Sequence, residues 1–130
     1  MKNKQVLSDL KMKKLVDLGL NINDASAYYS RGSSSSKKLQ WKTGYSKLLP
    51  GSKLTYTTDD ILRKLPKNIS EGYLFTLVYC PGSSIMYFDW NNGITLVEFK
   101  LQSWQVDIDL LFDCLKWCII NKHLEIEERD

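Results

Sequence analysis

Histidine and cysteine, which often carry metal-binding or nucleophilic chemistry, are scarce in this chain of 130 residues. There is one histidine, His123, and the three cysteines, Cys80, Cys114 and Cys118, form no CxxC pair. Structural zinc sites need four such ligands at close spacing. Two glycine-rich phosphate-binding patterns, GxGxxG and GxxxxGKS/T, are also missing. We therefore expect no metal site, no cofactor and no assembled catalytic set.

Long apolar runs are lacking as well. No stretch approaches the ~20 apolar residues that a membrane span needs, and no secretory signal pattern opens the chain. The cysteine count is odd, and Cys114 and Cys118 lie four residues apart on a predicted helix, a spacing that disulfide geometry rarely tolerates. These features predict reduced thiols and a cytoplasmic protein without membrane contact.

Ordinary proportions of apolar and charged residues, 43% and 25%, predict a globular chain. We expect a single domain over residues 1–130 with a flexible serine-rich loop at 31–38. Periodicity, capping residues and turn signals predict these elements in chain order: a helix over 8–18, a short helix over 25–29, a strand over 39–45, an extended piece over 54–56, a helix over 57–65, strands over 73–79, 85–90 and 94–100, and a helix from residue 107 or 109.

The clustering of strands predicts an α+β fold, in which a three- to four-stranded antiparallel meander packs against helices. Asn92-Gly93 is a strong two-residue hairpin signal, which pairs Asp89 with Leu96. In that register one face is almost wholly apolar and is expected to lie under the C-terminal helix; it carries Met86, Phe88, Trp90, Thr95, Val97 and Phe99. The opposite, mixed face carries Ile85, Tyr87, Asp89, Leu96, Glu98 and Lys100.

One candidate site follows from that mixed face. Asp89 with Glu98-Phe99-Lys100 resembles the Asp…Glu-x-Lys pattern of the PD-(D/E)xK nucleases. The resemblance implies two carboxylates that hold Mg²⁺ and a lysine that assists cleavage of a phosphodiester. The register places Asp89 diagonal to Glu98, close enough for a bridging ion. The alternative interpretation is a solvated sheet face with one cross-strand ion pair.

A second candidate is a lysine- and aromatic-rich segment. Aromatic rings stack on bases while lysines follow the backbone of single-stranded nucleic acid. The alternative interpretation is that the aromatic side chains are half-buried and the lysines serve solubility. The net charge of +3 gives only a weak basic bias. The candidate residues are Lys37, Lys38, Trp41, Lys42, Tyr45, Lys47, Lys53 and Tyr56.

Three stretches together resemble a group of small uncharacterised proteins carried by gut Bacteroidales and their prophages. They are Leu15–Leu20 leading to Asp24-Ala25, then Tyr56–Pro66, and finally Asp109–Leu111 through Trp117 to Asn121-Lys122. No activity is known for that group, so the resemblance implies an accessory protein of a mobile element. We expect a non-enzymatic interaction protein that binds a protein partner, with single-stranded nucleic-acid binding and an Mg²⁺-dependent nuclease as alternatives.

Overall fold

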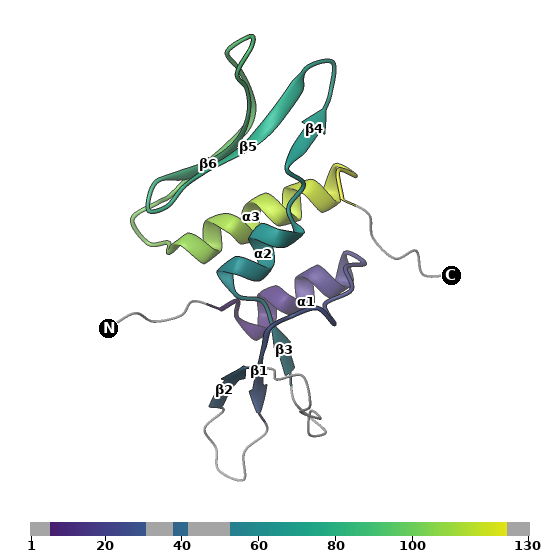
Figure 1. Cartoon of the computed structure of the whole chain (residues 1–130). Helices are drawn as coiled ribbons and strands as arrows, with labels where there is room; N and C mark the ends of the chain where they lie inside the picture. The colour runs from purple at the N-terminus through teal and green to yellow at the C-terminus, as the bar shows by residue number, and fades with distance from the viewer. Residues whose placement is uncertain (1–5, 31–37, 42–52, 125–130) are drawn as a thin grey trace.

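Three helices lie between two antiparallel sheets in the computed structural model, which describes residues 6–30, 38–41 and 53–124 (Figure 1). The helices are α1 (Asp9–Asp17), α2 (Thr58–Lys64) and α3 (Asp107–Ile120). The smaller sheet has the order β2-β1-β3, and the larger has the order β4-β5-β6-β7. The strands are β1 (Ala27–Ser30), β2 (Lys38–Trp41), β3 (Lys53–Thr55), β4 (Asn68–Ser70), β5 (Leu74–Cys80), β6 (Ser84–Asp89) and β7 (Ile94–Lys100). The predicted α+β class is confirmed.

The first two helices begin and end where the sequence predicts. Ser8 caps α1 by accepting a hydrogen bond from the backbone N–H of Lys11 at 3.3 Å, and Gly19 follows the helix with φ 100°. Thr57 and Asp60 form a capping box at the start of α2. Pro66 follows Leu65, whose extended backbone ends the helix.

The predicted short helix over 25–29 is wrong, because this segment enters the smaller sheet. β1 is the central strand and pairs Ala27 with both Trp41 and Thr55. Asp60 anchors its start by accepting hydrogen bonds from the Ser26 N–H at 2.9 Å and the Ser26 hydroxyl at 2.5 Å. Of the predicted strand over 39–45, residues 39–41 lie in β2; residues 42–45 and most of the serine-rich loop, 31–37, lie outside the described residues.

The hairpin between β6 and β7 differs from the predicted two-residue turn. Asp89 pairs with Ile94, so residues 90–93 form the connection. The Asp89 carboxylate accepts hydrogen bonds from the backbone N–H groups of Asn91 and Asn92, at 2.8 and 3.2 Å. The register also shifts between Tyr87 and Phe88. Val97 pairs with Tyr87 and Thr95 with Phe88, so Leu96 is the extra residue of a β-bulge on β7.

This register reverses the predicted core face of β6. Ile85 and Tyr87 are fully buried, whereas Phe88 is half-buried and Trp90 is 69% exposed. The bulge keeps Val97 and Phe99 opposite Tyr87 and Ile85, so these two residues of β7 point toward the core as predicted, whereas Thr95 pairs with Phe88 and lies on the other face. The prediction that Met86, Phe88 and Trp90 form the core side is therefore wrong, and Asp89, which was expected on the mixed face away from the core, is buried.

Helix α3 packs on the inward face of the larger sheet, as predicted, and contacts β6, β7 and α2 (Figure 1). The Tyr87 hydroxyl donates to the Pro66 carbonyl at 2.7 Å, and its ring stacks on Trp117 with centroids 6.3 Å apart. Cys114 and Cys118 are buried free thiols in this core. The other fully or nearly fully buried residues of α3 are Ile108, Leu110, Leu111, Phe112, Leu115 and Ile119.

The reversed face of β6 predicts an order of stabilities. Ile85→Ala removes a fully buried side chain, so we expect it to lower the free energy of unfolding by about 2–5 kcal/mol. Phe88→Ala truncates a half-buried side chain and is expected to cost only about 1 kcal/mol. Urea unfolding of both variants measures the difference. A larger loss for Phe88→Ala than for Ile85→Ala would mean that the other face of β6 packs in the core.

Candidate interaction surface

The larger sheet has one face that points away from α3, which we call the outer face. Because directly paired residues share a face, the register of β4 to β7 identifies its members. Helices lie on one side of this sheet only, and in the described part of the chain no element lies over the other side (Figure 1). The outer face is formed by Asn68, Ser70, Leu74, Thr76, Val78, Cys80, Ser84, Met86, Phe88, Thr95, Glu98 and Lys100, together with Trp90, whose ring contacts Phe88.

Large apolar side chains dominate the outer face. Trp90 is 69% exposed and Leu74 is 55% exposed. The rings of Phe88 and Trp90 meet edge to face, with centroids 4.9 Å apart and an interplanar angle of 78°. Val78 and Met86 are half-buried and lie opposite each other on adjacent strands. Contiguous exposed apolar surface of this kind marks binding sites in soluble proteins.

Charge is sparse and balanced on the same surface. Glu98 and Lys100 are exposed at its β7 edge, and within the described residues neither takes part in an ion pair. One acid and one base produce no positive field of the kind that attracts a phosphate backbone. The physical character of the outer face is therefore apolar and close to neutral.

The three residues of the nuclease pattern do not converge. Asp89 and Glu98 lie on opposite faces of the sheet, because Glu98 pairs with Met86, three residues before Asp89. The Asp89 carboxylate also accepts a hydrogen bond from the Asn92 side-chain amide at 2.7 Å, in addition to those from the turn backbone. Within the described residues there is no group of three or more potential metal ligands. The predicted bridging geometry for Mg²⁺ is absent from this site.

The lysine- and aromatic-rich segment is only partly described. Lys37, Lys42, Tyr45 and Lys47 lie outside the described residues, while Lys38, Trp41 and Lys53 are placed by their backbone in β2 and β3. Tyr56 is fully buried, and its hydroxyl donates to the Asp24 carboxylate at 2.8 Å. Burial and this hydrogen bond raise the pKa of Tyr56. Tyr56 is therefore a core residue and was wrongly included among the base-stacking aromatics.

His123, the one histidine, lies at the end of α3. Its ring stacks on Trp117 with centroids 5.1 Å apart, and Nε2 lies 3.4 Å from a carboxylate oxygen of Glu71. Its backbone N–H donates to the Cys118 carbonyl at 2.8 Å. These contacts connect the end of α3 to the turn between β4 and β5.

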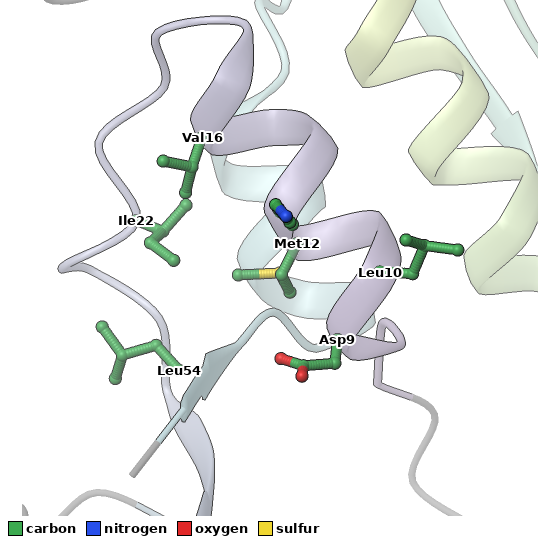
Figure 2. A pocket seen from close by; sticks show the side chains of 7 residues that line it. Asp9, Leu10, Met12, Val16, Ile22 and Leu54 are labelled. Atoms are coloured by element: carbon green, nitrogen blue, oxygen red, sulfur yellow. The ribbon is translucent and has the colours of Figure 1, made fainter. Parts of the chain in front are cut away.

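An open hollow of about 530 Å³ lies beside α1 (Figure 2). Met12, Val16, Ile22 and Leu54 give it an apolar lining, and Asp9 and Lys13 supply its charged groups. Figure 2 shows Leu10, another lining residue, directed toward α3 rather than toward Ile22. Mostly apolar walls and the lack of convergent polar side chains make this hollow a poor candidate for catalysis.

Sequence reasoning missed the outer face because it assigned Phe88 and Trp90 to the core. A usable signal was present: both sets of alternate residues in β6, Ile85/Tyr87 and Met86/Phe88, are apolar. In a sheet covered on one face only, such a strand must expose one of its two apolar sets.

Comparison of the chain with protein-family models, with curated proteins and with solved structures finds no match in any of the three. In residues 6–30, 38–41 and 53–124, no helix has the length and apolar character required to span a bilayer.

The turn around Asp89 predicts a measurable pKa change. The Asn92 amide, followed by the backbone N–H groups of Asn91 and Asn92, lowers the pKa of Asp89. Asn92→Ala should raise this pKa toward the ordinary value of about 3.9. Carboxyl NMR titration measures the change, and Asn91→Ala is the matched control, since Asn91 donates to Asp89 only through its backbone.

The sign of the linked stability follows from the lowered pKa. The stabilisation from ionised Asp89 is present above about pH 4 and is lost as the pH falls through the folded-state value. Asn92→Ala should reduce this loss. An Asp89 pKa that is unchanged in Asn92→Ala would contradict the hydrogen-bonded turn.

Proposed function

We propose that this protein is a non-enzymatic interaction module that binds a partner protein through the outer face of its larger sheet. The observation that carries the proposal is the contact between the half-buried Phe88 and the exposed Trp90, on a sheet face that no described element covers. Aromatic side chains are enriched at the centres of protein interfaces, where they bury a large area with few rotatable bonds. The partner surface is expected to be apolar and near neutral.

A protein partner suits this surface better than nucleic acid. Exposed aromatics also stack on bases, but single-stranded nucleic-acid sites combine them with a positively charged groove. Among the outer-face residues only Lys100 is basic, and Glu98 lies two residues away on the same face. We retain the lysine-rich segment around Trp41 as the second candidate, with binding to single-stranded nucleic acid as its test.

The biological setting is proposed from the sequence. The resemblance to proteins of gut Bacteroidales and their prophages supports an accessory role in a mobile element. Three free cysteines, Cys80, Cys114 and Cys118, support a reducing compartment such as the cytoplasm.

Two exposed tryptophans allow a matched test. Trp90 lies on the outer face, whereas Trp104, 79% exposed, lies in the connection between β7 and α3. Tagged wild-type, Trp90→Ala and Trp104→Ala proteins are used to capture partners from a gut Bacteroidales extract, with quantitative mass spectrometry as the readout. We expect a protein bound by wild type and Trp104→Ala to be lost with Trp90→Ala, since hot-spot truncation costs about 2 kcal/mol or more.

A labelled single-stranded DNA titration at low and high salt forms the second arm. Salt-sensitive binding that is lost with Trp41→Ala would replace the protein-binding proposal with the nucleic-acid one. Partners retained equally by Trp90→Ala and wild type would also overturn the proposal. Urea unfolding of Trp90→Ala checks that the loss is not one of folding.

A further inference from the structure

One edge of the larger sheet is β7, the last strand in the order β4-β5-β6-β7, and no other described strand pairs with its free side. The Leu101 N–H donates to the Ser83 carbonyl at 2.8 Å, so the peptide groups of Leu101 point toward β6. The direction of the peptide groups alternates from one residue to the next along an antiparallel strand. The N–H and C=O groups of Glu98 and Lys100 therefore point away from β6, toward the free side of β7. The Lys100 carbonyl accordingly accepts a hydrogen bond from the Gln102 side chain, at 3.1 Å, instead of from a strand.

The residues at this edge form a symmetric pattern. Val97, Phe99 and Leu101 lie on the inward side, and Glu98 and Lys100 lie on the outer face. Across β6, Glu98 is opposite Met86 and Lys100 is opposite Ser84, so neither charge has an opposite charge beside it. Read in either direction, Val97–Leu101 runs apolar, charged, aromatic, charged, apolar, with the sign of charge reversed.

We propose that β7 pairs antiparallel with β7 of a second copy of this chain, about a twofold axis at Phe99. In this register Glu98 lies opposite Lys100 of the second copy, and Lys100 lies opposite its Glu98. Phe99 lies opposite Phe99, and Val97 lies opposite Leu101. The peptide groups of Glu98 and Lys100, which point outward, become the hydrogen-bonded pairs, and the Glu98 N–H of the second copy replaces the Gln102 side chain as donor to the Lys100 carbonyl. Two four-stranded sheets then form one continuous eight-stranded sheet.

Charge and hydrogen-bond direction together select this register. An axis between two residues would place outward-pointing peptide groups opposite inward-pointing ones, so no ladder would form. An axis at Glu98 or at Lys100 would place like charges directly opposite each other, which is unfavourable. An axis at Val97 would set Glu98 against Leu96, the bulge residue, and would leave both charges unpaired.

A groove below the edge provides further surface for the second copy. It has a volume of about 250 Å³ and lies between β7 and α3. Ile120 on its wall is 58% exposed, a large exposure for an isoleucine on a helix that packs in the core. A twofold axis perpendicular to the sheet places both α3 helices, and therefore both grooves, on the same side of the joined sheet. Lining residues are Phe99, Asp113, Lys116, Trp117, Ile120 and Asn121.

Charge reversal on the full chain tests the pairing. Sedimentation equilibrium of the wild type over a wide concentration range is expected to show a monomer–dimer equilibrium. Glu98→Lys sets lysine against lysine, and Lys100→Glu sets glutamate against glutamate. Each is expected to raise the dimer dissociation constant about tenfold or more, because symmetry changes two cross-strand pairs at once.

Complementation separates the pairing from a loss of folding. Mixing the Glu98→Lys and Lys100→Glu proteins restores opposite charges at both positions, so we expect a heterodimer of near wild-type affinity. The doubly exchanged Glu98→Lys/Lys100→Glu chain is expected to form a homodimer again. Asp17→Lys, a reversal of an exposed charge at the end of α1, is the control and should leave the dimer unchanged.

A wild-type chain that stays monomeric at every concentration would overturn the proposal, as would a dimer that the single reversals leave unchanged. Failure of the mixed variants to associate would also count against this register. Trp90→Ala should not affect the dimer, so loss of partner capture in that variant and loss of dimerisation in the charge variants are independent results.

Discussion

The packing of α3 against Tyr87 decides which face of the larger sheet is inward, and the exposed surfaces depend on that choice. Tyr87 is fully buried, its hydroxyl donates to the Pro66 carbonyl, and the Cys118 sulfur lies 3.7 Å from the same hydroxyl. A buried hydroxyl without a partner costs about 1–3 kcal/mol, so this position requires an acceptor such as the Pro66 carbonyl at the end of α2. With Tyr87 inward, Met86 and Phe88 face outward.

Local signals predicted the elements whose ends depend on neighbouring residues. Ser8 and Gly19 bound α1, and Thr57 and Pro66 bound α2. The facing of β6 was not predictable in this way, because both of its alternating sets are apolar and the choice rests on a contact between Tyr87 and Pro66, 21 residues apart. Asn92-Gly93 suggested a two-residue turn, but the hydrogen bonds of Asp89 to the turn stabilise a longer one.

Two errors in the predicted sites have similar structural causes. The proposed metal pair depended on the hairpin register, and a different turn places Asp89 and Glu98 on opposite faces. Tyr56 looked like a surface aromatic beside lysines, yet its hydrogen bond to Asp24 belongs to the core.

The sequence-based expectation of an interaction protein rested on missing catalytic motifs; the structure adds a particular surface, the outer face. Pairing of β7 edges would place two such faces side by side, doubling the area available to a partner.

The central claim is that the outer face is open in the folded protein, and the two described methionines test it directly. Met86 is half-buried on the outer face, whereas Met12, on the inward side of α1, is only 2% exposed. Brief treatment of the native protein with hydrogen peroxide, followed by peptide mass spectrometry, measures the oxidation rate at each sulfur. We predict that Met86 is oxidised well before Met12. Equal rates, or protection of Met86 relative to Met12, would contradict the open outer face.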